Sequence, residues 1–218
     1  MPHRFRSTGF TLLELITVLA VVAILASLAA VAVMRGTSRI RVSNAAFEVG
    51  ALYTAAQMRA TSLGVPHYVV FHDDGTEFGV YLLERPDGLS AVDWSRGQVK
   101  APELLGGTLH EHLRLSREHG LGFVDFNASA VQPLPAPFTS ISLAASGSGG
   151  LLAGCTFCGT GDGGARGVIR FSPDGTVKVL TSTSATTTPG GVLGFAPEGQ
   201  GQPRLVVIAA PAGAIRVF

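Results

Sequence analysis

This chain of 218 residues contains little charge and few cysteines. Charged residues make up 14% of it, and its formal net charge is +1. A nearly neutral chain argues against a protein that binds nucleic acid or another polyanion by bulk electrostatics. The sequence also lacks a nucleophile elbow, a phosphate-binding loop and a zinc-helix motif. We therefore expect no enzyme, no resident cofactor and no metal ion.

A long apolar run occupies the N-terminal part of the chain. A short leader with two basic residues, Arg4 and Arg6, precedes the pair Gly9 and Phe10. About 25 mostly apolar residues follow, enough for a helix of roughly 37 Å that crosses a hydrocarbon core of about 30 Å. One carboxylate, Glu14, lies near the start of this run. A carboxylate at that depth is costly in lipid and usually marks a function.

The N-terminal segment G-F-T-L-L-E-L-I-T-V-L-A-V-V-A-I-L-A (residues 9–26) resembles the type IV prepilin class over its whole length. The resemblance implies cleavage between Gly9 and Phe10 by a prepilin peptidase, N-methylation at Phe10, and docking onto other pilins or pseudopilins through Glu14. It also implies an inner-membrane assembly platform as partner. A secretory signal peptide would have a shorter apolar core. An ordinary signal anchor fits the length but does not explain Glu14.

Two C-terminal segments narrow the resemblance. V-I-R-F-S-P-D-G-T-V (residues 168–177) and R-L-V-V-I-A-A-P-A-G-A-I-R-V (residues 204–217) are similar to the C-terminal half of GspH/FimT-like minor pseudopilins. FimT-like members linked to DNA uptake carry a G-R-x-R element here, which in this chain reads Gly213-Ala214-Ile215-Arg216. Arg216 is the one DNA-binding candidate that remains. Because a lone arginine neutralises about one phosphate, we do not expect nucleic acid as a partner.

The chain divides into four predicted parts. They are a leader (residues 1–9), a transmembrane and assembly helix (10–34), an amphipathic continuation of that helix (35–64) and a β-rich periplasmic domain (65–218). Gly64 followed by Pro66 is a typical helix stop. The helical spacing of the continuation predicts a buried face. Its residues are Ile40, Phe47, Ala51, Ala55 and Met58.

The residues after the helix contain several segments typical of β-strands, so we predict an α+β fold in which a long N-terminal helix packs on an antiparallel β-sheet. Segments 67–71 and 78–83 flank Asp74-Gly75, a hairpin signal, and Ser172–Thr176 forms a second turn of this kind. Residues 146–150, 159–164 and 181–191 are rich in Gly, Ser and Thr and are predicted loops. Further strands are predicted at residues 113–115, 122–126, 140–143, 168–171, 177–180, 192–195, 205–209 and 214–217.

The two cysteines, Cys155 and Cys158, lie in the Gly-rich sequence G-C-T-F-C-G. A zinc ribbon would need a second ligand pair, which the chain lacks. The predicted topology places these cysteines outside the cytoplasm, where disulfides persist. This favours a tight local disulfide, while two free thiols and metal or redox chemistry remain open.

Three further groups carry polar side chains of functional types. His110, Glu111, His112 and His119 could gather a metal, because histidines at i and i+2 share one face of a strand, but a charged solvated loop or edge strand is the favoured interpretation. Asp73, Asp74 and Glu77 resemble a small calcium loop with too few ligands for a dedicated site. A hairpin turn explains them better. Asp162 is a single acid in a predicted loop.

The predicted function is that of a minor pseudopilin of a type II secretion system. The chain would be a single-pass inner-membrane protein with a periplasmic C-terminal domain, drawn into a periplasmic fibre. A minor pilin of a type IV pilus, accessory in pilus assembly or DNA uptake, is the alternative. A membrane-anchored periplasmic enzyme or binding protein is a third reading, which an uncut N-terminus would favour.

Overall fold

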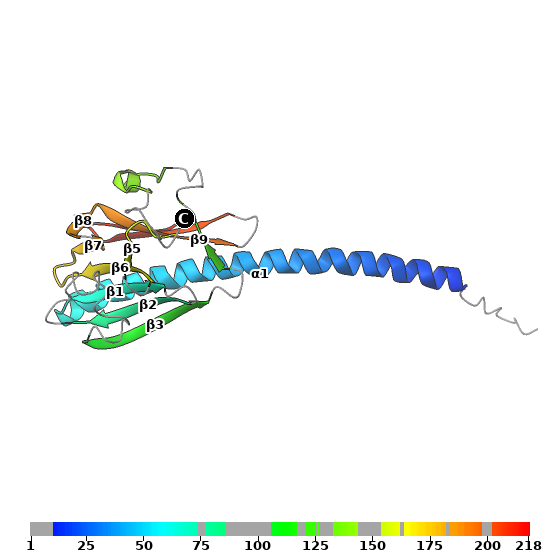
Figure 1. The fold of residues 1–218 in the computed structure, drawn as a ribbon, viewed down its shortest axis with the longest axis horizontal. Coiled ribbons are helices and arrows are strands. Elements are labelled where there is room, and N and C mark those ends of the chain that lie inside the picture. The colour runs from blue at the N-terminus through cyan, green and yellow to red at the C-terminus, as the bar shows by residue number, and fades with distance from the viewer. Residues whose placement is uncertain are drawn as a thin grey trace, which may run out of the picture. The chain divides into compact units, whose positions relative to one another are not determined.

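The computed structural model describes residues 11–73, 77–85, 106–116, 121–124, 126, 133–143, 154–161, 164–181, 184–197 and 202–218 (Figure 1). The chain forms two units, Met1–Thr37 and Ser38–Phe218. The described part of the first unit is helical apart from Thr11, and the second contains all the described strands.

Helix α1 (Leu12–Leu63) is 52 residues long. It ends where the sequence predicted, because Gly64 adopts a φ of 70° and donates its backbone N–H to the carbonyl oxygen of Ala60 at 3.1 Å. This left-handed cap satisfies one of the carbonyl groups that a helix end leaves unpaired.

The second unit contains two antiparallel sheets. The larger, here called sheet A, has the strand order β3-β2-β1-β6-β7-β8, with β5 paired to β6, and the smaller, sheet B, has the order β11-β10-β9-β4. The predicted α+β fold with an antiparallel β domain is confirmed, and the β part is divided between two sheets. The strands are β1 (His67–Asp73), β2 (Glu77–Glu84), β3 (Thr108–Ser116), β4 (Leu121–Phe123), β5 (Gly159–Gly161), β6 (Gly164–Phe171), β7 (Val177–Thr181), β8 (Ser184–Thr188), β9 (Gly190–Pro197), β10 (Arg204–Ala209) and β11 (Ala214–Val217).

The main core forms around the part of α1 that belongs to the second unit, which runs between the two sheets in Figure 1. Val49 and Tyr53 of α1 are completely buried together with Phe71 of sheet A and Val206 of sheet B. The Tyr53 ring meets the Phe71 ring edge-on at 6.1 Å. Burial without a hydrogen-bond partner for its hydroxyl among the described residues raises the pKa of Tyr53 above its ordinary value.

The predicted buried face of the helix is wrong. Ile40, Phe47 and Met58 are 61%, 60% and 65% exposed, Ala51 is exposed and Ala55 is partly buried. The buried side chains lie on a neighbouring stripe, because small residues there let both sheets approach the helix closely. That stripe consists of Val42, Ala45, Ala46, Val49, Leu52, Tyr53, Ala56 and Ala60.

Two predicted strands and two predicted loops also need correction. Residues 140–143 are not a strand: Phe138–Ser140 forms a 3₁₀ turn, and Pro133, Pro135 and Pro137 just before it disfavour a sheet ladder. Of the strand predicted at residues 122–126, only the first two residues belong to a strand, β4, which ends at Phe123. Two predicted loops contain the strands β5 and β8, and the run of threonines in β8 has the β-branched side chains that favour strands.

The turn predicted at Ser172–Thr176 joins β6 to β7 as expected. Gly175 has a φ of 82°, which favours glycine there. Asp174 accepts hydrogen bonds from the hydroxyl group of Thr176 at 2.6 Å and from its backbone N–H at 2.9 Å. These bonds, the side-chain one first, lower the pKa of Asp174. The strands β1 and β2 also pair as predicted, and their turn at residues 74–76 lies outside the described residues.

Candidate functional site

The N-terminus of α1 carries a reciprocal pair of capping hydrogen bonds between Thr11 and Glu14. The backbone N–H of Glu14 donates to the Thr11 hydroxyl oxygen at 3.2 Å, and the backbone N–H of Thr11 donates to Glu14 Oε2 at 3.3 Å. This is a capping box, in which each residue satisfies a backbone donor that the first helical turn leaves unpaired. The spacing Thr-x-x-Glu was the signal for it, and sequence reasoning missed it.

The capping box gives Glu14 a local structural role and fixes where its carboxylate lies. The carboxylate sits in the first turn of the helix, where the positive end of the helix dipole favours negative charge. Its Oε2 atom accepts a hydrogen bond from the backbone N–H of Thr11, the residue that follows Phe10. Gly9 and Phe10, the predicted cleavage and methylation residues, lie outside the described residues.

Beyond the capping box, the part of α1 that belongs to the first unit is mostly apolar, and no described residue covers it. An 18-residue window has a mean hydropathy of 2.8, and none of it is buried within the chain. The large apolar residues of the first unit are 48–76% exposed, among them Leu12, Val18 and Leu28. This helix is long and apolar enough to cross a membrane, and it fits a single-pass membrane anchor.

The segment with both cysteines is part of the core. The sulfur atoms of Cys155 and Cys158 are 1.99 Å apart, at bonding distance, and both residues are at most 1% exposed. Cys155 forms an isolated bridge to Leu193 of β9. Phe157 lies between the two cysteines in the sequence, and its ring packs edge-on against that of Phe71 at a centroid distance of 5.2 Å. The sequence showed only that this segment is rich in glycine and gave no signal for its burial.

The room for Phe157 comes from two glycines on the neighbouring strands. A Cβ at Gly167 of β6 would lie 2.9 Å from the Phe157 ring, and one at Gly191 of β9 would lie 2.5 Å from it. Any side chain at these positions would collide with the ring. Through Phe157, the short cysteine segment fills the space between the two sheets, and its role is structural.

Residues 108–116 of the histidine-rich segment form β3, which lies at the edge of sheet A among the described strands, as the edge-strand interpretation predicted. The prediction that His110 and His112 share one face is wrong. Pairing between β2 and β3 shifts by one residue between Leu82 and Leu83, so that His110 is an extra residue on β3. A bulge of this kind turns a side chain to the other face of a strand. His112 stacks on Tyr81 at 4.0 Å, whereas His110 stacks on His67 at 5.4 Å.

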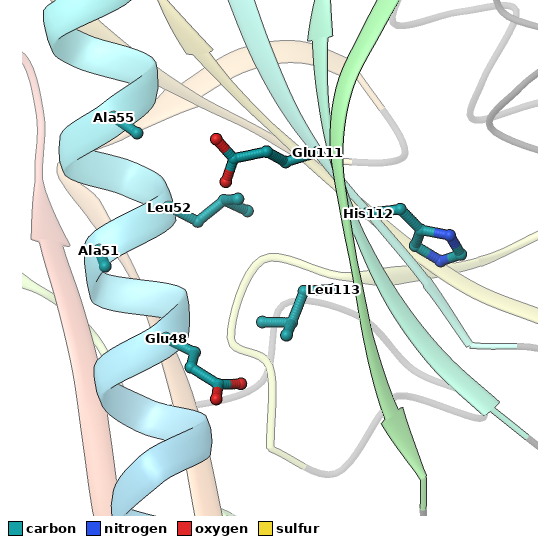
Figure 2. A pocket seen from close by; sticks show the side chains of 7 residues that line it. All are labelled: Glu48, Ala51, Leu52, Ala55, Glu111, His112 and Leu113. Atoms are coloured by element: carbon teal, nitrogen blue, oxygen red, sulfur yellow. The ribbon is translucent and has the colours of Figure 1, made fainter.

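A groove of about 440 Å³ separates β3 from α1 (Figure 2). Figure 2 shows Glu111 extending toward α1 while His112 lies on the far side of β3. Arg59 of α1 pairs with Glu111 at 3.0 Å beside the groove. Both partners are more than a third exposed, so this ion pair contributes little to stability. The groove is lined by Glu48, Ala51, Leu52, Ala55, Glu111, His112 and Leu113.

Within the described part of the chain, the other predicted residues form no group of three possible metal ligands. Asp73 is buried at the end of β1, and Glu77 at the start of β2 lies 3.4 Å from the Nε atom of Arg114. Glu77 thus pairs with an arginine of β3, and the antiparallel pairing of β1 with β2 fits the predicted hairpin. Arg216 is exposed on β11, an edge strand of sheet B. Asp74, His119 and Asp162 lie outside the described residues.

The N-terminal segment also matches a known family. Residues 4–30 match the family model described as the prokaryotic N-terminal methylation motif. This match is consistent with a type IV prepilin-like protein, and proteins with such a motif are structural subunits rather than enzymes. Comparison with curated proteins and with solved structures found no match.

Proposed function

We propose that this chain is a minor pseudopilin of a type II secretion system. A prepilin peptidase cuts it between Gly9 and Phe10 and methylates the new terminus at Phe10. The chain then leaves the inner membrane and joins a periplasmic fibre through its N-terminal helix. The observation that carries this proposal is the methylation motif on residues 4–30, which contains both Phe10 and Glu14. It lies at the start of a helix whose apolar, membrane-length stretch no described residue covers.

The packing of the second unit supports a subunit role. Ile40, Phe47 and Met58 repeat every seven and eleven residues, so they lie on one stripe of α1. All three are at least 60% exposed. An apolar stripe that the chain's own sheets leave open is suited to contact with neighbouring subunits.

The similarity of the C-terminal segments to GspH/FimT-like proteins supports a minor subunit. A secretion system is favoured over a pilus because the basic element linked to DNA uptake lacks its first arginine, which is replaced by Ala214 in this chain. Identification of the pilin-like proteins that co-purify from membranes separates the two systems. Secretion pseudopilins would support the proposal, and pilus subunits would replace it with a minor pilin of a type IV pilus.

The processing step predicts a defined mature mass. The membrane-extracted chain is expected to have the mass of residues 10–218 plus one methyl group, measured by intact-mass spectrometry. Gly9→Val is expected to leave the precursor uncut, because glycine gives a protease the closest approach to the backbone. Thr8→Val, one residue earlier, is the matched control and is expected to be processed. A wild-type chain that begins at Met1 would show an ordinary signal anchor.

Glu14→Ala is expected to preserve membrane insertion and cleavage but to lower incorporation into the fibre by about tenfold. A tenfold change corresponds to about 1.4 kcal/mol of lost interaction with a neighbouring amino terminus. The measurement is the fraction of chain that co-sediments with sheared fibres.

Two further variants separate charge from capping. Glu14→Gln keeps an oxygen atom that can accept from the Thr11 N–H but removes the charge, and we expect it to assemble as poorly as Glu14→Ala. Thr11→Ala removes the capping hydroxyl, keeps the charge and is expected to assemble. Normal assembly of Glu14→Gln would show that the charge of Glu14 does not dock the subunit.

A further inference from the structure

Two histidines and one glutamate lie together at one end of sheet A. β1 begins at His67 and β2 ends at Glu84, and the register places these two residues opposite each other. His110 comes from β3, the next strand of the sheet. One possible ligand atom from each of the three side chains lies within 4.8 Å of the other two.

The bulge in β3 is what brings His110 to this cluster. Without the extra residue, regular alternation would place His110 on the same face as His112, which stacks on Tyr81. With it, His110 Nε2 lies 2.9 Å from Glu84 Oε2, and its ring stacks on that of His67. Bulges often serve to re-aim one side chain at a functional position.

His67 supplies an independent observation that points to a ligand. It is completely buried, and its Nδ1 lies 2.9 Å from the carbonyl oxygen of Val65. Because a carbonyl oxygen only accepts, this Nδ1 carries the proton, and the lone pair is on Nε2. Nε2 has no hydrogen-bond partner among the described residues and lies 3.9 Å from Glu84 Oε2.

A buried acceptor without a donor is costly, so the arrangement needs an explanation. Metal-binding histidines commonly donate their other ring N–H to a backbone carbonyl group, which fixes the tautomer and orients the ring. His67 has this arrangement. A hydrogen bond between His110 and Glu84 alone would account for those two residues but would leave His67 Nε2 unpaired.

We propose that His67, Glu84 and His110 bind a Zn²⁺ ion, with water as the fourth ligand. Two imidazole nitrogen atoms and one carboxylate oxygen suit a borderline-soft transition metal better than Ca²⁺ or Mg²⁺. Bonds of about 2.0–2.1 Å in a tetrahedron place ligand atoms about 3.3 Å apart. Glu84 Oε2 lies 2.9 Å from His110 Nε2 and 3.9 Å from His67 Nε2, one distance just below this value and one just above it.

The site is open to solvent on one side and anchored on the other. The side chains of Glu84 and His110 are each 23% exposed, while that of His67 is fully buried. The ion can therefore enter beside Glu84 and His110, and water can fill the fourth position. Bound metal would join the ends of β1, β2 and β3. This site shares no residue with the proposed fibre contacts, which involve the first unit and the exposed stripe of Ile40, Phe47 and Met58.

The test uses the full chain in detergent, stripped with a chelator and then given Zn²⁺. We expect one bound Zn²⁺ per chain after dialysis, measured by elemental analysis. We also expect excess Zn²⁺ to raise the melting temperature by about 5 °C or more, because a ligand that binds only the folded state stabilises it. Ca²⁺ and Mg²⁺ at the same concentrations are expected to cause no shift.

The variants Glu84→Gln and His110→Gln are expected to lose at least about tenfold in Zn²⁺ affinity and to lose the shift in melting temperature. His112→Gln, on the same strand but the other face, is the matched control and is expected to behave as wild type. His67 is not replaced, because the loss of this buried side chain would destabilise the fold by itself. The metal-free melting temperatures of Glu84→Gln and His110→Gln are compared with that of His112→Gln, which shows whether the two test variants fold normally without metal. No stoichiometric Zn²⁺ in the wild type, or equal binding by both test variants, would overturn the proposal.

Discussion

Val49→Asp is expected to destabilise the 38–218 unit by about 5 kcal/mol or more at pH 7. Val49 is completely buried between the sheets, so the new carboxyl group must be neutral. Protonating a carboxyl group at pH 7 costs about 4 kcal/mol at its ordinary pKa, and the lost valine burial adds about 1.5–3 kcal/mol. A domain of this size has about 5–15 kcal/mol in total. The measurement is urea unfolding of residues 38–218 exported to an oxidising compartment.

Phe47→Asp is the matched control, two residues away on the same helix. Phe47 is 60% exposed, so the same aspartate can remain hydrated and charged. We expect a change within about 0.5 kcal/mol. In the full chain, this variant is expected to weaken fibre assembly instead, because Phe47 belongs to the exposed apolar stripe. Equal destabilisation by both variants would mean that the buried face of α1 is assigned wrongly.

Replacement of both cysteines by serine is expected to cost at least about 2 kcal/mol more than their replacement by alanine. From ring size alone the cost is small, because so short a ring removes few unfolded conformations. Burial changes this expectation, since Cys155 and Cys158 are at most 1% exposed within the main core. Each serine hydroxyl without a partner there costs about 1–3 kcal/mol. Urea unfolding of the 38–218 unit measures the difference.

The alanine pair is the control for loss of the disulfide without a buried hydroxyl. Alkylation of the wild type in denaturant without reductant tests the bond itself and is expected to label neither cysteine. Two labelled thiols would show that the pair is reduced. Equal stability of the serine and alanine pairs would show that the segment does not pack between the sheets as described.

Local patterns in the sequence predicted the parts of the fold that depend on local chemistry. The end of α1 at Gly64 was predictable because a left-handed cap needs glycine, and the turn at Ser172–Thr176 because Asp-Gly supplies both the side-chain acceptor and the positive φ. The Asp74-Gly75 pair between β1 and β2 likewise predicted a hairpin, and the two strands pair as expected. Each of these signals lies within about ten residues of chain.

The buried face of α1 could not be predicted in the same way. Both stripes of the helix carry apolar residues, Phe47 on one and Tyr53 on the other. The choice between them depends on two sheets formed much later in the chain, which need the close approach that alanines such as Ala46 and Ala56 permit. The same limit applies to the cysteine segment, whose burial depends on the space left by Gly167 and Gly191.

The sequence by itself determined the long apolar helix, the basic residues before it and the carboxylate at Glu14, because hydropathy, charge and a short motif need no partner in space. Only the tertiary structure decided which polar residues meet. His67, Glu84 and His110 are 17 and 26 residues apart along the chain, and strand register together with one bulge brings them within 4.8 Å. Register is set by pairing between strands over the whole sheet, so a list of histidines in the sequence carries no information about it.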